Sequence, residues 1–271
     1  MGGGYCMAKK YSSSEYNLLS STIVEETLDT NPFEKISNIV LKELESAIIT
    51  SQFSPGQKLS VSQIAEAMNV SPTPVWEAIE RLQQLGLVVT EPIRNSRRKT
   101  YHVFNMSKAE IEDFFLTRAA LESLAAHICA SKNWKVDLRL LKTYADEFNN
   151  GMVRYSKEYD GHPIDTVKQP LETSRLDHGF HQLIVDSTQN KFLINSYNVL
   201  SKTTRYLSIK TAYYIGLELN LDDALTLGAH HMTIYNAISN GYADLARNVM
   251  LTHVNFCANH YLRNYNLDPC E

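Results

Sequence analysis

Four side chains of metal-binding type lie in the C-terminal half of the chain, in segments with helical patterning. Asp177 and His181 are four residues apart and so share one face of a helix, while His231 and His253 belong to two later segments. Apolar residues recur at helical spacing around these positions, so each is expected to point into a core. A single histidine on an apolar face is ordinarily a core residue with a hydrogen-bond partner. Three histidines and an aspartate on three helices of one bundle instead indicate a metal site.

The donor types narrow the choice of ion. Imidazole with one carboxylate suits Zn²⁺, Ni²⁺, Mn²⁺ or Fe²⁺ rather than Ca²⁺, so we expect a divalent metal ion as the cofactor. His230 precedes His231, but adjacent residues project about 100° apart around a helix. We therefore interpret His230 as a non-ligand.

An arginine is expected to be buried in the same half of the chain. Arg118 lies among apolar residues of a helical segment, and a buried cation is costly unless it is paired. The simplest partner is Glu122, four residues further on. Some further side chains are candidates for a pocket lining, although their spacing alone does not select them: Arg205, Tyr206, Tyr213 and Tyr214.

A helical domain must position these residues. Ser107 with Glu110 three residues later is a capping box, and from there to Tyr265 the pattern favours helices throughout. The expected helices cover residues 107–131, 135–159, 167–188, 190–215, 221–239 and 242–265. Helices in such a series, joined by short breaks, predict an all-α antiparallel bundle.

The N-terminal half has a different pattern. Three helices are expected over residues 36–48, 60–68 and 71–86, followed by two β-prone stretches over residues 87–90 and 100–104. Ser71 with Pro72 is a typical helix start, and Gly86 a typical helix end. Three helices followed by a hairpin predict a winged helix-turn-helix, in which the N-terminus of the third helix enters the major groove of DNA.

The expected hairpin has a basic tip. Four cations fall within six residues there, namely Arg94, Arg97, Arg98 and Lys99. A charge run can be a solvated loop, but at the tip of a wing it favours contact with phosphate or the minor groove. We therefore predict that these four residues bind DNA.

Length and composition are consistent with two domains. The chain has 271 residues with 44% hydrophobic side chains, enough for two separate cores. We expect a mobile arm over residues 1–31 with at most a helical turn near residues 23–28. A winged helix-turn-helix domain over residues 32–104 and a helical sensing domain over residues 105–271 follow. The predicted fold class is thus mainly α.

Charge and cysteine usage exclude several classes of protein. The net charge of −4 argues against a protein that coats nucleic acid without selectivity, so contact with DNA must come from a local patch. Neither a secretory signal nor an apolar run long enough to span a bilayer is recognisable. The four cysteines show no metal-knuckle or redox-motif spacing, which is typical of free thiols in a reducing cytoplasm.

The N-terminal motifs resemble a known family. The segments concerned are Phe53-Ser54-Pro55-Gly56-Gln57-Lys58-Leu59, Ile64-Ala65-Glu66, Val70 through Ile79, and Leu85-Gly86-Leu87-Val88. Over residues 33–90 they are similar to the DNA-binding domain of GntR-family regulators. The chain departs from this family at Pro72 and Trp76, where relatives commonly have arginines that read guanine or phosphate. The operator sequence of a relative therefore cannot be transferred to this chain.

The residues left at the start of the recognition helix are Ser71, Thr73 and Trp76, which we expect to contact DNA. Glu77 lies beside them. The Trp76 ring can meet a thymine methyl group, or it can pack against a neighbouring helix. Both interpretations of Trp76 are open at this point.

The C-terminal half resembles the FCD domain, the effector domain of the FadR subfamily. The resemblance covers residues 107–265 and rests on Asp177-x-x-x-His181, on His231 through Ile238, and on Gly241 with His253. It implies that Asp177, His181, His231 and His253 hold a divalent ion, and that this ion helps to bind a small carboxylate. It also implies that Arg118 grips the anionic effector, for which its planar fork is suited.

The two halves together predict a ligand-responsive transcription regulator, which we expect to be a repressor. Its partners would be a double-stranded DNA operator, a small organic acid and a second copy of the chain, because helix-turn-helix proteins usually match palindromic sites. Two alternatives stay open. The metal can be purely structural, or the chain can be a metal-dependent enzyme that acts on a small carboxylate, although no added general base is evident near the ligands.

Overall fold

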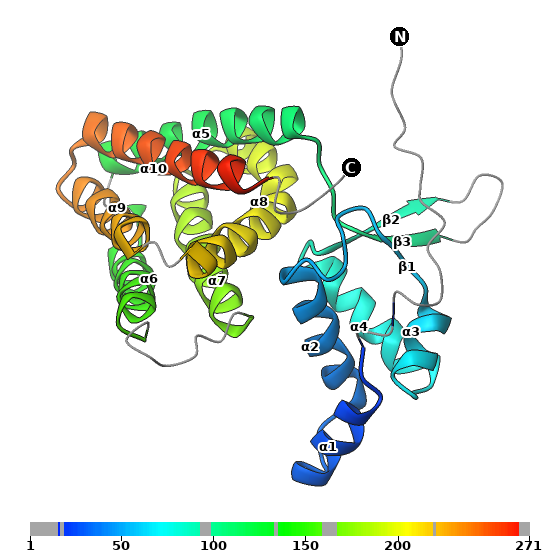
Figure 1. Ribbon diagram of the computed structural model, residues 1–271. Coiled ribbons are helices and arrows are strands. Elements are labelled where there is room, and N and C mark those ends of the chain that lie inside the picture. The colour runs from blue at the N-terminus through cyan, green and yellow to red at the C-terminus, as the bar shows by residue number, and fades with distance from the viewer. Residues whose placement is uncertain are drawn as a thin grey trace. The chain divides into compact units, whose positions relative to one another are not determined.

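The computed structural model describes Tyr16 and residues 19–92, 99–132, 135–158, 167–218 and 221–265. The described residues divide into two compact units, one up to Asn105 and one that begins at Met106 (Figure 1). The sequence places the division one residue earlier, after residue 104. Within the described ranges, no helix combines the length and the apolar character that a membrane span requires.

The described part of the N-terminal unit contains four helices and a small antiparallel sheet. Its elements are α1 (Thr22–Thr30), α2 (Ile36–Ile49), β1 (Lys58–Leu59), α3 (Val61–Ala67), α4 (Pro72–Gln84), β2 (Val88–Pro92) and β3 (Lys99–Val103). The strand order is β1-β3-β2, with Val88 opposite Val103 and Lys58 opposite His102. The two later strands form the predicted hairpin. The two-residue strand β1 was not predicted, because it is too short to show a periodic pattern.

Helix α4 shows why the predicted helix-turn-helix forms. Its apolar residues Val75, Ala78, Ile79 and Leu82 recur at helical spacing and are completely buried. Proline occupies its first position, where the missing N–H costs nothing. The chain turns at Gly86, which has a φ of 78° that favours glycine.

The segment before Pro32 differs from the expectation. Instead of an irregular arm with at most one helical turn, residues Thr22–Thr30 form a nine-residue helix that packs on α2 and buries Val24. Upstream of it, the Tyr16 hydroxyl donates to the Lys58 carbonyl at 3.0 Å and accepts from the Ser60 N–H at 2.9 Å. Local propensity is weak in this serine-rich stretch, so its order depends on tertiary contacts that the sequence pattern does not reveal.

Among the residues that the structure describes, the C-terminal unit is a bundle of six helices. They are α5 (Lys108–Ser131), α6 (Leu138–Glu158), α7 (Lys168–Ser187), α8 (Lys191–Glu218), α9 (Leu221–Ser239) and α10 (Ala243–Asn264). The predicted capping box is present, since the Ser107 hydroxyl accepts from the Glu110 N–H while the Glu110 carboxylate accepts from the Ser107 N–H. The all-helical fold predicted for this half is therefore confirmed.

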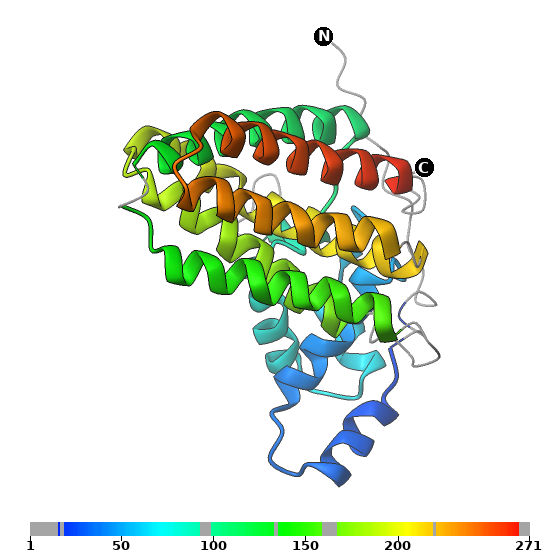
Figure 2. The same ribbon diagram turned by 90° about the vertical axis from the view of Figure 1, so that its left-hand side faces the viewer.

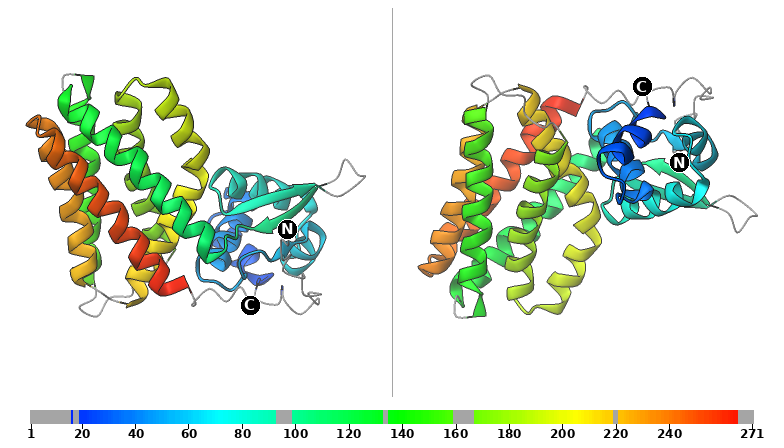
Figure 3. Two further views of the ribbon diagram at one scale, coloured as in Figure 1. Left: turned by 90° about the horizontal axis from the view of Figure 1, so that it is seen from above. Right: turned by 90° about the horizontal axis from the view of Figure 1, so that it is seen from below.

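Neighbouring helices of the bundle enclose its core. Helix α10 packs on α5 along its length. Helix α9 packs on α10 and also on α6 (Figure 2). Helix α7 completes the arrangement by packing on both α6 and α8. The view from above shows α5 and α10 running side by side (Figure 3). Side chains from α5, α7, α8, α9 and α10 can therefore meet in one interior.

Candidate metal centre

Three helices bring the four predicted donors together inside the bundle. Asp177 and His181 lie one turn apart on α7, His231 lies on α9 and His253 lies on α10. All four are buried, and the three histidines have no exposed surface. One ligand atom from each side chain can be chosen so that all four lie within 4.8 Å of one another. The sequence-based selection of these residues thus corresponds to one compact cluster.

The separations between donor atoms match those around a single ion. Asp177 Oδ1 lies 3.4 Å from His181 Nε2, 3.3 Å from His231 Nε2 and 3.9 Å from His253 Nε2. The Nε2 atoms of His181 and His253 are 3.1 Å apart. Two donors bound to zinc at about 2.0–2.1 Å stand about 3.4 Å apart at the tetrahedral angle. The donor set therefore fits a divalent ion.

An unsatisfied atom supports the same conclusion. His231 Nε2 is buried and makes no hydrogen bond, although it points at the carboxylate of Asp177. A buried polar nitrogen without a partner is costly, so native proteins rarely contain one. A metal ion at the centre of the cluster would satisfy it.

Residues behind the donors hold them in orientation. Glu122 Oε2 lies 2.8 Å from His181 Nδ1, which leaves His181 Nε2 facing the cluster. The Ser208 hydroxyl donates to Asp177 Oδ2 at 2.6 Å, which leaves Asp177 Oδ1 facing the imidazoles. Outer partners of this kind fix the tautomer and direction of metal ligands. The sequence suggested Glu122 only as a partner of Arg118, and it gave no signal for Ser208, which is 31 residues from Asp177.

Two phenylalanines enclose the imidazole of His231. The ring centroid of Phe180 is 4.3 Å away in a stacked arrangement, and that of Phe148 is 4.0 Å away. Burial lowers the pKa of His231 to about 4, and it holds the pKa of His253 well below the usual value. Both rings are therefore held in the neutral form that binds metal.

Two carboxylates reverse this effect at His181. Burial alone opposes the charged form, but the carboxylates of Glu122 and Asp177 outweigh it and raise the pKa of His181 to about 9. Asp177 itself is ionised, because His181 and Arg118 outweigh the effect of burial and hold its pKa well below the usual value. The same negative potential favours a bound metal ion, which would take the place of the proton on His181 Nε2.

Arg118 is a second polar feature of this interior. Its side chain is 2% exposed, and Nε donates to Glu122 Oε1 at 2.6 Å, so the simplest partner considered from the sequence is present. Its Nη2 lies 3.9 Å from Asp177 Oδ2 and makes no hydrogen bond. Against the effect of burial, Arg118 and His181 lower the pKa of Glu122 to about 2. One side of the guanidinium is thus neutralised, while the other retains a free donor.

A small cavity of about 20 Å³ adjoins the cluster and Arg118. Its polar lining consists of Arg118, Thr173, Asp177, Ser208, Thr211 and Cys257. The interior has room for about one water molecule, so an organic acid requires the bundle to open. The side chains Arg205, Tyr206, Tyr213 and Tyr214 are not among those that line this cavity. Helix α8 presents the face with Leu207, Ser208 and Thr211 instead, because its rotation is set by packing on α7.

Comparison with known proteins identifies the family. The model for "Bacterial regulatory proteins, gntR family" matches residues 36–95, and the model for the FCD domain matches residues 113–256, which is more than half of the chain. This chain belongs to the GntR family. It is accordingly a DNA-binding transcriptional regulator with an FCD effector domain, in a family of regulators rather than enzymes.

Individual relatives agree with this assignment. The regulator YdhC of Bacillus subtilis is 22% identical over 218 residues, covering 80% of this chain and 87% of that protein. The "HTH-type transcriptional repressor RspR" of Escherichia coli is 24% identical, covering 83% of this chain and 88% of that protein. A solved structure of the Listeria monocytogenes regulator Lar has a TM-score of 0.57 at 18% identity, covering 85% of this chain and 98% of that one. At this identity the structure supports the fold alone.

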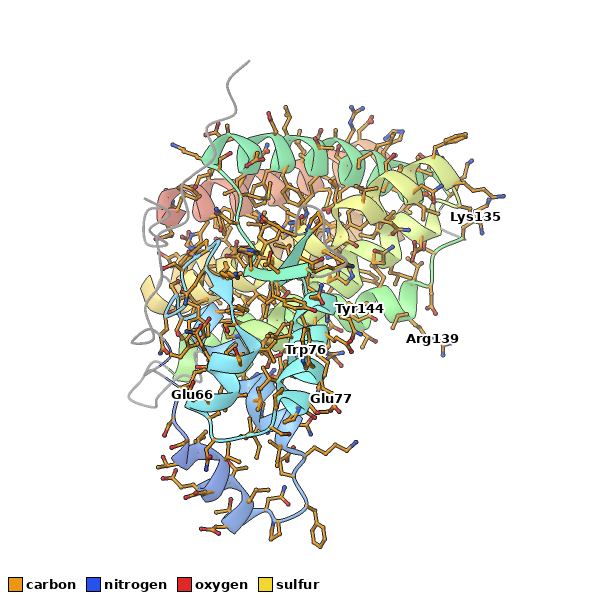
Figure 4. All side chains as sticks on the ribbon, turned by 90° about the vertical axis from the view of Figure 1, so that its right-hand side faces the viewer. Glu66, Trp76, Glu77, Lys135, Arg139 and Tyr144 are labelled. Atoms are coloured by element: carbon orange, nitrogen blue, oxygen red, sulfur yellow. The ribbon has the colours of Figure 1, made fainter. Side chains whose placement is uncertain are left out.

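The recognition helix of this GntR-family chain presents a short exposed surface. Ser71, Thr73 and Trp76 are all exposed on the first turns of α4, and the Ser71 hydroxyl makes no capping hydrogen bond. Trp76 is 43% exposed, and its ring meets the Tyr101 ring of β3 edge to face with centroids 5.2 Å apart. It therefore packs on the wing and stays partly exposed, with Glu77 beside it (Figure 4).

The wing is described only at its base. Lys99 begins β3 and is exposed, in a position compatible with the predicted contact with DNA. Arg94, Arg97 and Arg98 lie outside the residues that the structure describes. Their contact with DNA stays a prediction from the sequence.

Proposed function

We propose that this GntR-family regulator senses a small organic acid through a divalent metal ion held by Asp177, His181, His231 and His253. The observation that supports this most strongly is the convergence of four buried donors beside an arginine with one unpaired nitrogen. A bound ion would supply a positive centre that attracts a carboxylate oxygen. The cluster, the cavity and Arg118 would then form one effector site.

The side chains around the cavity determine which ligand the proposed site accepts. Arg118 Nη2 is the free donor for an anionic group, and a carboxylate matches the geometry of the guanidinium fork. Thr173 and Thr211 line the same space, and a threonine hydroxyl can hydrogen-bond to a hydroxyl or a second carboxylate of the ligand. Apolar neighbours such as Phe115 and Leu227 limit the size of the ligand. A compact hydroxy acid or dicarboxylic acid fits this description.

The ligand must act on DNA affinity through two arrangements of the protein. It can shift their balance only by its difference in affinity for them. The short connection over residues 104–107 is the segment that would transmit the change. We further propose that the regulator works as a homodimer on a palindromic operator. A repressor role is supported by RspR, a relative whose name states that role.

A second candidate function is favoured by the size of the cavity. With a volume of about 20 Å³, it does not admit an organic acid without movement of the helices. In this alternative the metal only stabilises the bundle, and a different signal or none controls DNA binding.

Thermal denaturation of the metal-loaded protein separates these two candidates. The full chain is heated with each member of a panel of small mono-, di- and hydroxycarboxylates, and the matching amides serve as controls. We expect at least one acid to raise the melting temperature while its amide does not, because a ligand that binds only the folded state stabilises it. If chelation lowers the melting temperature but no acid raises it, the structural alternative is correct and the sensor proposal fails.

A further inference from the structure

Cys257 lies one helical turn after His253 on α10, with its thiol directed toward the donor cluster. Its Sγ is 3.9 Å from His253 Nε2, and the side chain is buried and forms no disulfide. The spacing repeats that of Asp177 and His181 on α7, since both pairs stand four residues apart on one face of a helix. Two helices thus each direct an i, i+4 pair of potential ligands into the same interior.

The cavity gives a second observation on the place of Cys257. This residue lines it together with Asp177, Arg118 and Ser208, so it borders the same small space as the cluster. The donors beside it include His231 Nε2, a completely buried nitrogen without a hydrogen-bond partner. An unpartnered ligand atom of this kind points to an ion at the centre of the cluster.

The distance from sulfur to nitrogen is compatible with a shared ion. With a zinc–sulfur bond of about 2.3 Å and a zinc–nitrogen bond of about 2.1 Å, the two donors stand about 3.1 Å apart at a right angle and about 3.6 Å apart at the tetrahedral angle. The observed 3.9 Å exceeds these values by about 0.3–0.8 Å. The ligand atoms that lie within 4.8 Å of one another do not include Cys257 Sγ, so bonding through sulfur requires this side chain to move toward the centre when the ion binds.

We propose that Cys257 is an additional, thiolate ligand of the metal centre and makes it selective for ions that bind sulfur well. This inference rests on the proposed metal site. When the ion binds, a metal–sulfur bond forms, the S–H bond breaks, and the proton passes to the buffer. Thiolate ligands favour zinc, cobalt and nickel over manganese and magnesium, for which oxygen ligands are preferred. The site therefore discriminates among divalent ions more sharply than an aspartate and three imidazoles alone.

Cobalt is the probe that tests this assignment. The full chain is stripped of metal and loaded with Co²⁺, and bound cobalt is counted by elemental analysis while absorption is recorded in the near-ultraviolet. A thiolate bonded to Co²⁺ gives a charge-transfer band that imidazole and carboxylate ligands do not produce. We expect this band in the wild type and in a variant that keeps Cys257 as its only cysteine, with Cys6, Cys129 and Cys270 each replaced by serine. We expect Cys257→Ala to bind cobalt without the band.

Cys129→Ser is the matched control, because its thiol is also buried but donates to the Ile184 carbonyl at 3.0 Å. It should keep the band and the wild-type ratio of affinities for Zn²⁺ over Mn²⁺. In Cys257→Ala this ratio should fall by at least about tenfold. If the wild type binds one cobalt ion without the band, the assignment of Cys257 is wrong while the metal site stands. If the wild type binds no cobalt, both proposals fail.

Discussion

Asp177 lies close to more of the side chains in the proposed metal centre than any of the three histidines does. One carboxylate oxygen faces three histidine nitrogens, while the other accepts a hydrogen bond from Ser208 and lies 3.9 Å from Arg118 Nη2. The pair formed by Arg118 and Glu122 neutralises itself, so Asp177 supplies the negative charge that a cation would meet. At this scale, charge and ligand geometry favour the same occupant.

The first prediction at the residue scale concerns the histidines. His231→Ala and His253→Ala should each reduce bound metal to a small fraction of the wild-type content, because each change removes one of four converging donors. Metal content after dialysis is measured by elemental analysis. His230→Ala is the control, since this half-buried neighbour is not part of the cluster and should retain the metal. Full retention of metal in both cluster variants would contradict the assignment.

The sequence predicts which four side chains form the cluster, but not the residues that contact them. Helical periodicity is sufficient to show that Asp177, His181, His231 and His253 point inward, because it is a local property. The contact of Ser208 with Asp177 joins residues 31 apart, and the contact of Glu122 with His181 joins two different helices. Such contacts depend on the rotation of each helix in the bundle, which no local pattern specifies. The position of Cys257, four residues after His253, is a local pattern that could have indicated a shared helix face. Considering only the spacing between cysteines does not detect it.

Helix α6 shows how elements position the centre. It supplies no donor, yet its Phe148 packs on the His231 ring with centroids 4.0 Å apart. The helix can lie this close to α9 because Gly228 has no side chain. A Cβ there would stand 2.5 Å from Asn149 Oδ1 and 3.2 Å from Asn149 Cα. The second of these atoms is backbone, so α6 itself would have to move.

A prediction at the element scale follows from this packing. Gly228→Ala should lower the free energy of unfolding by about 1–3 kcal/mol, the usual cost of overpacking a core. Gly151→Ala is the matched control on α6, because a Cβ there meets nothing within 4 Å. It should be neutral or raise the free energy of unfolding by up to about 1 kcal/mol through helix propensity. Urea denaturation measures both variants, and equal stability of the two would show that α6 does not pack closely on Gly228.

The elements themselves were predicted unevenly. The long helices of the bundle and the helices of the DNA-binding unit have strong apolar periodicity, so their existence was predictable. Helix α1 was expected only as one turn near residues 23–28, and strand β1 was not predicted, because nine residues with one buried apolar side chain and two residues of strand carry little pattern. Both become ordered through contacts with α2 and β3.

At the scale of the whole molecule, the regulator combines a GntR DNA-binding domain and an FCD effector domain in one chain with a net charge of −4. Affinity for DNA must then come from local cations. The exposed start of α4 has Ser71, Thr73 and Trp76 but no arginine at the positions of Pro72 and Trp76. The basic wing is therefore expected to supply more of the phosphate contacts than in relatives that keep these arginines.

A prediction on salt dependence tests the wing. Neutralising Arg97 and Arg98 together should weaken binding to all DNA sequences alike, because the cations that neutralise phosphates release counterions whatever the base sequence. The slope of log affinity against log salt should become shallower by about 0.9 for each phosphate that the variant no longer neutralises. Binding is measured by fluorescence anisotropy across a salt series with specific and random duplexes. An unchanged slope would show that these arginines do not contact phosphate.

Occupancy of the proposed site in the bundle should change the affinity for DNA. The decisive measurement is the affinity of the metal-loaded full chain for an operator selected from random DNA, with and without an acid that raises its melting temperature. We expect a change of about 5- to 150-fold, the range typical of coupled sites, in the wild type and none in His231→Ala. If an acid stabilises the wild type but leaves its affinity for the operator unchanged, the bundle does not control DNA binding through this site.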